Sequence, residues 1–156
     1  LYPYKNYKRP ADAGIDAIGD VALGCPCFEA AEASALHQPR TFYYRFDYDD
    51  NAFPDMVGAA HSVEISFIFN TNDRQPSSIL YWSHQIKKAQ PLTEIMMSYW
   101  TNFAKTGDPN GPGLPEWQSY NLQTRQRIYL ALPVHSGPAE NQSRCEFWRE
   151  QNIRLK

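Results

Sequence analysis

The clearest pattern of apolar and polar positions lies between residues 91 and 107. Apolar side chains recur there at steps of three and four residues, which is the period of one helix face: Leu92, Ile95, Met96, Tyr99, Trp100 and Phe103. Pro91 suits a first helical position, where its missing N–H needs no partner. Gly107 suits a left-handed cap, and Pro109 prevents the helix from continuing. The pattern predicts a helix from Pro91 to the Gly107 cap, with its apolar face in the core.

The rest of the chain mixes helical and strand patterns. Residues 10–37 predict two helical pieces broken near Gly24, Cys25 and Pro26, and residues 41–48 predict an aromatic strand. A short strand is predicted around residues 128–132, and a last helix from about residue 140. Residues 63–69 fit a short strand or a buried helical turn equally well. Because helical and strand segments alternate, we expect the α/β fold class.

Composition excludes several classes of protein. The chain has 156 residues, 42% hydrophobic and 21% charged, which is typical of a globular domain. A net charge of −2 provides no basic surface for nucleic acid. No apolar run approaches the roughly 20 residues of a membrane-spanning helix. Residues 1–10 contain neither an initiator Met nor the apolar core of a signal peptide, so we expect a processed or cut end.

One histidine is distinguished by its neighbours. His61 follows Val57-Gly58-Ala59-Ala60 and precedes an apolar run that ends at Phe69. A loop that leads into a core is a usual way to hold a general base, and an imidazole exchanges protons near neutral pH. The alternative is an ordinary packed or surface histidine, and these residues leave both interpretations open. His37, His84 and His135 have no ligand-like neighbours and are interpreted as surface residues.

Metal binding has little support in the sequence. His61 and Glu64 form a His-x-x-Glu pair, but an inverted zinc-protease motif needs a second histidine where Ile65 stands. Cys25 and Cys27 have Cys-x-Cys spacing, which differs from the usual Cys-x-x-Cys pattern of metal and redox sites. We therefore expect neither a metal nor a cofactor.

The three cysteines and one N-glycosylation pattern bear on whether the protein is intracellular or extracellular. Three cysteines are too few for a disulfide scaffold, and the simplest accounting is one long-range disulfide with one free thiol. Asn141-Gln142-Ser143 is an acceptor pattern for N-glycosylation. A disulfide and a glycan together are typical of secreted proteins. We therefore expect an extracellular glycoprotein with Asn141 as the acceptor.

A serine hydrolase requires a nucleophile, a base and a carboxylate that orients the base. The chain contains neither a Gly-x-Ser-x-Gly elbow nor a Gly-Gly oxyanion loop. Ser62 adjoins His61 but lacks the strand-to-helix turn that exposes a nucleophile. Of the three parts, the sequence offers the base alone.

Three blocks resemble the C-terminal third of the type-B carboxylesterase family. They are residues 57–69, the block Tyr-Trp-Thr-Asn-Phe-Ala-Lys-Thr-Gly-Asp-Pro-Asn at residues 99–110, and Cys-Glu-Phe-Trp at residues 145–148. That family includes cholinesterases, carboxylesterases and fungal lipases of the α/β-hydrolase fold. The blocks occur in the family's order and at similar spacing. By resemblance, residues 1–156 are the C-terminal segment of a single α/β-hydrolase domain, with its last strands and packing helices, and not an independent domain.

The resemblance assigns roles to individual residues. It places the family's catalytic histidine at His61 and a supporting glutamate near the site at Glu64. It also implies a disulfide between Cys25 and Cys145. The family usually has glycine after the catalytic histidine, whereas this chain has Ser62, which we interpret as a small departure that leaves the base undisturbed.

The function implied by the resemblance is that of a serine carboxylesterase or lipase acting on small ester substrates. In that family the serine, the oxyanion loop and the triad acid precede the segment matched here. We therefore expect the N-terminal portion of the same enzyme as a partner, as a separate or cleaved chain. The alternative is a non-catalytic adhesion or carrier module of the same fold. Phe53, Met56 and Phe67 are candidates for a pocket wall, and the ester preference is left open.

Overall fold

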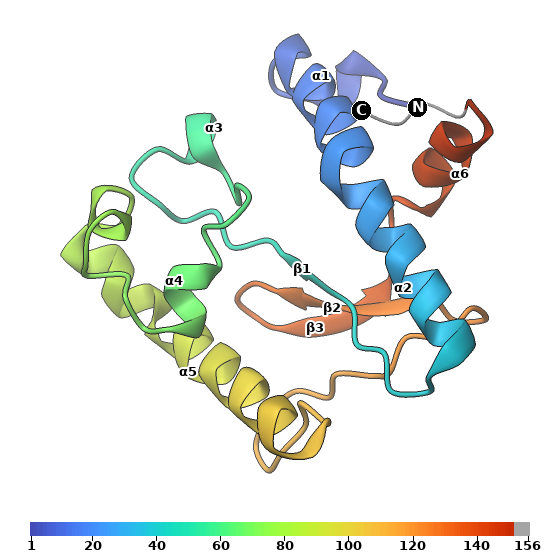
Figure 1. Cartoon of the computed structure of the whole chain (residues 1–156). Helices are drawn as coiled ribbons and strands as arrows, with labels where there is room; N and C mark the ends of the chain where they lie inside the picture. Colours follow the sequence, from blue (N-terminus) through green and yellow to red (C-terminus); the bar gives the residue numbers. More distant parts are fainter. Residues whose placement is uncertain (152–156) are drawn as a thin grey trace. The chain divides into compact units, whose positions relative to one another are not determined.

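The structure is a computed structural model, and it describes residues 1–151 (Figure 1). The chain divides into two compact units, which are described separately. The first, here called the helical unit, comprises residues 1–41, 120–125 and 138–151. The second, here called the sheet unit, comprises residues 42–119 and 126–137.

The helical unit begins with a short 3₁₀ turn, η1 (Tyr4–Asn6), and a long helical stretch. That stretch consists of α1 (Pro10–Gly19), the π-helical segment η2 (Asp20–Gly24) and α2 (Cys25–His37). The predicted break near residues 24–26 is therefore wrong. The Cys25 N–H donates to the Asp20 carbonyl five residues earlier, and this wider turn carries the helix past Pro26, which has no N–H to donate. Figure 1 shows α1 to α2 as one continuous ribbon.

The last helix, α6 (Gln142–Glu150), packs against α2 within the same unit. Phe28 of α2 and Cys145 of α6 are fully buried, and the Phe28 ring makes an edge contact with Tyr120 at a centroid distance of 6.4 Å. Arg149 forms ion pairs with Glu29 and Glu32, at 3.2 and 2.6 Å. Such partly exposed pairs each contribute little, typically about 0–1 kcal/mol, so most of the packing energy comes from the buried apolar groups.

The sheet unit contains a three-stranded sheet in the order β1-β2-β3. Its strands are β1 (Tyr44–Phe46), β2 (Gln126–Leu130) and β3 (His135–Pro138), and the last residue of β3 is counted with the helical unit. β1 and β2 are parallel, with Tyr44 opposite Ile128. Parallel neighbours need a crossover, and here it contains α3 (Pro54–Val57), α4 (Ile65–Ile68), η3 (Ser77–Ile79) and α5 (Ser83–Thr106). The predicted strand over residues 41–48 is thus shorter than expected, and residues 63–69 contain a helical turn.

The long helix α5 begins eight residues before the predicted start. Pro91 lies inside the helix and not at its first position. The N-terminus is held by the Gln85 side chain, whose oxygen accepts a hydrogen bond from the Trp82 N–H at 3.1 Å. The C-terminal prediction is confirmed, because Gly107 caps the helix with φ 71° and its N–H donates to the Phe103 carbonyl.

Aromatic rings form most of the core of the sheet unit. Phe67 is fully buried and makes edge contacts with Phe46, Tyr48 and Tyr81 at centroid distances of 5.1–5.5 Å. This core lies against α5 through Leu92, Met96 and Tyr99, all fully buried. Such contacts add about 0.5–1.5 kcal/mol per ring pair beyond burial, and they fix α4 and the chain segment before it.

Candidate functional site

His61 lies in the turn between α3 and α4, two helices that Figure 1 labels. Its side chain is exposed, and the residues on either side are not packed core. Within residues 1–151, no hydrogen bond or ion pair joins the imidazole to another group. The structure therefore presents His61 at a surface.

Ser62 follows with φ 71°, in the left-handed region that favours glycine. This conformation gives a physical reason for the glycine that is usual at this position in the resembling family. A residue with a Cβ pays about 1–2 kcal/mol for it. Ser62 therefore strains the turn that carries His61. From the sequence, the replacement of glycine by Ser62 was interpreted as a small departure.

The backbone around His61 is held by two buried polar side chains. Before it, Asn51 is 2% exposed, and its amide nitrogen donates to the Gly58 carbonyl at 2.9 Å. After it, the Ser66 hydroxyl lies 2.9 Å from the Val63 carbonyl and also contacts Asn72. Sequence reasoning did not identify either residue. The sequence holds one signal for Asn51. It stands two residues before Phe53, and an asparagine side chain can accept a hydrogen bond from the backbone N–H two residues later, as in an Asx turn.

Glu64 lies three residues after His61, at the position immediately before α4. Its side chain is partly buried and makes no hydrogen bond or ion pair within the described chain. The structure therefore brings Glu64 and His61 into the same turn but does not join them. The supporting role of Glu64 stays a prediction.

Several apolar side chains before and after His61 in the chain are exposed. Phe53, Met56, Ile65 and Phe69 are 44, 83, 47 and 69% exposed. Phe67, the third residue suggested for a pocket wall, is instead fully buried in the aromatic core. Scattered apolar residues are ordinary on a protein surface, and all four of these lie within eight positions of His61 in the sequence.

A separate pocket lies at the carboxyl end of β1. It has a volume of about 620 Å³ and is lined by Asp47, Tyr48, Asp49, Asp50, Lys88, Ala131 and Leu132. Lys88 pairs with Asp50 at 3.2 Å, and its hydrogen bond lowers the pKa of the Asp50 carboxyl. Burial, with the nearby aspartates, raises the pKa of the Tyr48 hydroxyl. His61 is not among the lining residues, so this pocket does not contain the candidate base.

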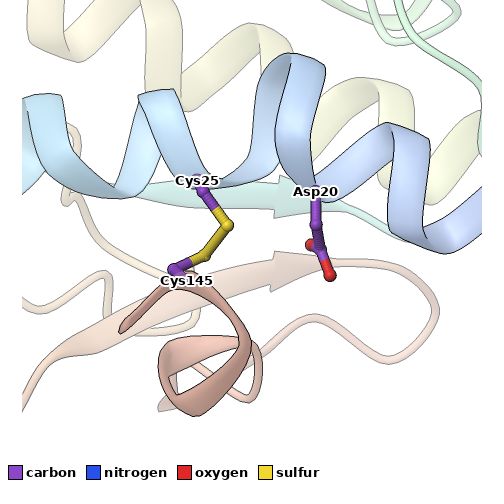
Figure 2. A group of neighbouring side chains, drawn as sticks. All are labelled: Asp20, Cys25 and Cys145. Atoms are coloured by element: carbon purple, nitrogen blue, oxygen red, sulfur yellow. A yellow bond between two sulfur atoms is a disulfide. The ribbon is translucent and has the colours of Figure 1, made fainter. Parts of the chain in front are cut away.

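Cys25 and Cys145 are joined by a disulfide, as the family resemblance implied, and Cys27 is an exposed free thiol. Figure 2 shows the Asp20 carboxylate beside this bond. Within residues 1–151, Asp20, Cys25 and Cys145 are the one group of three potential metal ligands that lie close together. Sulfur binds metals as thiolate, and both sulfurs are committed to each other. With the disulfide closed, the Asp20 carboxylate is the one group of the three that could bind a metal ion.

Asn141, the sequon residue, is 5% exposed. Its amide nitrogen lies 3.4 Å from an Asp20 oxygen and 3.4 Å from the Cys145 sulfur. A side chain added at Gly24 would also meet this nitrogen at 3.4 Å. A glycan bonded to this nitrogen requires that the amide leave its place beside the disulfide.

Residues 2–148 match the model of the carboxylesterase family. The chain is 32% identical over 143 residues to carboxylesterase 5A of Canis lupus familiaris, covering 89% of this chain and 24% of the relative. It is 31% identical over 147 residues to acetylcholinesterase of Gallus gallus, covering 92% of this chain and 18% of the relative. The chain thus spans about a quarter or less of the length of these relatives. Within residues 1–151, no helix is long and apolar enough to cross a membrane.

Proposed function

The chain belongs to the carboxylesterase family, and from this we propose that it is the C-terminal part of an α/β-hydrolase that cleaves carboxylic esters. In this proposal His61 is the general base of a serine esterase. The serine nucleophile, the oxyanion donors and the triad acid belong to the N-terminal portion of the same enzyme. The enzyme is secreted, and its substrate is a small ester.

The observation that carries this proposal is the presentation of His61. Its imidazole is exposed, while the backbone on both sides is tied to buried polar side chains. A general base must meet its nucleophile at about 2.6–3.2 Å. An imidazole that projects from a fixed turn is suited to meet a serine on another part of the enzyme, and the apolar residues beside it are suited to cover the substrate.

The reaction would proceed through an acyl-enzyme. The serine oxygen attacks the ester carbonyl while a ring nitrogen of His61 takes the hydroxyl proton. His61 then gives this proton to the departing alcohol, and the C–O bond of the ester breaks. In the second half, His61 takes a proton from water while the water oxygen attacks the acyl carbonyl. The bond between the acyl carbon and the serine oxygen then breaks, His61 returns the proton to that oxygen, and the carboxylic acid leaves. The exposed Phe53 and Met56 would contact the apolar part of the ester.

The test is His61→Ala in the complete enzyme, with hydrolysis of a short-chain nitrophenyl ester as the assay. Loss of a triad base lowers kcat by about 10⁴–10⁶. His37→Ala is the matched control, since His37 is also exposed and plays no part in the mechanism, and its kcat should be unchanged. Activity of His61→Ala within tenfold of the wild type contradicts the proposal. If the wild type itself hydrolyses no ester, the non-catalytic adhesion or carrier module is the better account.

A further inference from the structure

We propose that Asn51 is a positioning residue for His61, acting through the backbone of the turn that carries the imidazole. The inference rests on the proposed function, because it takes His61 to be the base. Asn51 lies ten residues before His61 in a segment of loops and one short helix. It does not contact the imidazole in the described structure, and its effect is exerted through main-chain hydrogen bonds.

The side-chain amide of Asn51 makes three hydrogen bonds to main-chain groups. Its nitrogen donates to the Asp49 and Gly58 carbonyls at 3.1 and 2.9 Å. Its oxygen accepts from the Phe53 N–H at 2.9 Å. A carboxamide has two N–H donors and an acceptor oxygen, so both donors and the oxygen are engaged. With 2% exposure, water cannot readily replace these partners, and an aspartate would lack both donors.

The bond to Gly58 closes the loop at its most demanding point. Gly58 has φ 53° and ψ −146°, which is a conformation close to those that glycine alone adopts readily. The next residues, Ala59 and Ala60, lead directly to His61. Asn51 therefore holds the carbonyl at which the chain changes direction, three residues before the base. The Ala52 N–H also donates to the Leu80 carbonyl at 2.7 Å, which ties the start of the loop to the segment before α5.

A second set of bonds holds the far side of the turn. The Ser66 hydroxyl contacts the Val63 carbonyl and the Asn72 side chain, and the Asn72 amide donates to the Thr93 hydroxyl of α5 at 3.2 Å. Ser66, Asn72 and Thr93 are all at least 97% buried. The chain between Gly58 and Val63 is thus anchored at both ends. His61 owes its position to these anchors, because its own side chain is exposed.

This arrangement makes the rate sensitive to Asn51. Misplacing a catalytic group by about 1 Å can lower a rate by about 10². Removing the donors of Asn51 leaves the Gly58 carbonyl without its partner, so the loop relaxes and the imidazole spreads over a wider range of positions. We expect kcat to fall. The same loop carries Phe53 and Met56, which the proposed function places against the ester, so we expect KM to rise as well.

The test compares Asn51→Asp with Asn110→Asp in the complete enzyme. Asn110 makes comparable main-chain bonds, since its amide donates to the Trp117 carbonyl at 3.0 Å and its oxygen accepts from the Trp117 N–H at 2.7 Å. Its amide also donates to the Asp108 carboxylate at 2.9 Å, so the control loses at least as many bonds as Asn51→Asp. Both variants lose amide donors in the same unit. We expect kcat of Asn51→Asp to fall about 10- to 100-fold, and kcat of Asn110→Asp to stay within threefold. Equal losses of kcat in the two variants would show a merely structural role and overturn the inference.

Hydrogen exchange over residues 58–63 reads the loop itself. Exchange should become faster in Asn51→Asp but not in Asn110→Asp, and unchanged exchange overturns the inference. If Asn51→Asp does not fold, Ser66→Ala removes the opposite anchor and should also lower kcat and speed exchange. Wild-type kcat and exchange in Ser66→Ala would count against the inference.

His61→Ala separates the proposed role of His61 as base from the proposed role of Asn51 as positioning residue. An active His61→Ala rejects the proposed function and the positioning role together, whereas an inactive His61→Ala with a fully active Asn51→Asp rejects the positioning role alone.

Discussion

Replacing both bonded cysteines, as Cys25→Ala with Cys145→Ala, should lower the free energy of unfolding by about 5 kcal/mol. The disulfide joins residues separated by 120 positions, and the chain-entropy model gives about 5 kcal/mol at 25 °C for a loop of this length. Both sulfurs are buried, so their removal also leaves a small cavity. The ion pairs of Arg149 with Glu29 and Glu32 persist in the variant, but partly exposed pairs of about 0–1 kcal/mol each do not replace the crosslink.

The assay is urea unfolding of the complete enzyme, followed by tryptophan fluorescence, with Cys27→Ala as the control. Cys27 is exposed and unbonded, so its replacement should change the unfolding free energy by less than about 0.5 kcal/mol. Alkylation provides a direct count, because one thiol of this chain should react in the native protein and three after reduction. A loss below about 1 kcal/mol in the double variant, or three reactive thiols in the native protein, would refute the reasoning.

Three further predictions concern individual side chains. Ser62→Gly should raise the free energy of unfolding by about 0.5–1 kcal/mol. Removing the strain of a left-handed serine gains about 1–2 kcal/mol, and the added backbone entropy of glycine costs about 0.5–1 kcal/mol. Urea unfolding measures this gain, and Ser62→Ala, which keeps the Cβ, is the control that should show none. Glycan at Asn141 should be scarce on chains with the closed disulfide and more abundant in Cys145→Ala, and glycopeptide mass spectrometry that finds full occupancy on disulfide-bonded chains would contradict this. The pKa of Asp50 is lowered by Lys88, so the folded state binds this proton less tightly than the unfolded state, and the stabilisation is present above the ordinary carboxyl pKa and lost as the pH falls through the lowered value. Asp50→Asn should therefore show a smaller drop in Tm than the wild type between pH 5 and pH 2, and an equal drop would count against the Lys88 contact.

The helix α5 shows what the apolar pattern could and could not predict. Its C-terminal half was predicted correctly, because Leu92, Met96 and Tyr99 repeat at helical spacing and are buried. Its start was misplaced, since Pro91 suits a first position and the preceding residues are polar. Within the helix, Pro91 is exposed, so water can satisfy the carbonyl that its missing N–H would have bonded. A local rule on proline was overridden by the solvent-facing position of that residue.

The break predicted near Gly24 failed for a related reason. Gly24, Cys25 and Pro26 are each unfavourable in a helix or common at its ends. In the structure a π-helical turn passes through this segment, and the disulfide from Cys25 to Cys145 together with the packing of Phe28 holds it. The disulfide and the packing of Phe28 involve residues more than 90 positions away. A sequence pattern over a short window contains no information on such contacts.

The candidate site was predicted in part. The sequence directed attention to His61 and its loop, and the structure places that imidazole at the surface on a turn anchored at both ends. The anchors were missed because Asn51 and Gly58 are seven residues apart in irregular chain, where spacing carries no period. The left-handed conformation of Ser62 was also missed, because serine itself gives no indication of a positive φ. The pairing of the cysteines came from the family resemblance and not from their spacing.

The most direct test of the central claim is the rate at which a fluorophosphonate probe labels the complete enzyme, with and without His61→Ala. The account predicts a labelled serine outside residues 1–156 in the wild type, and labelling slower by at least about 10³ in His61→Ala, because the serine then has no base to remove its proton. Equal labelling rates in the two proteins would contradict the role of His61. A wild-type enzyme that takes up no label would contradict the assignment as a serine esterase.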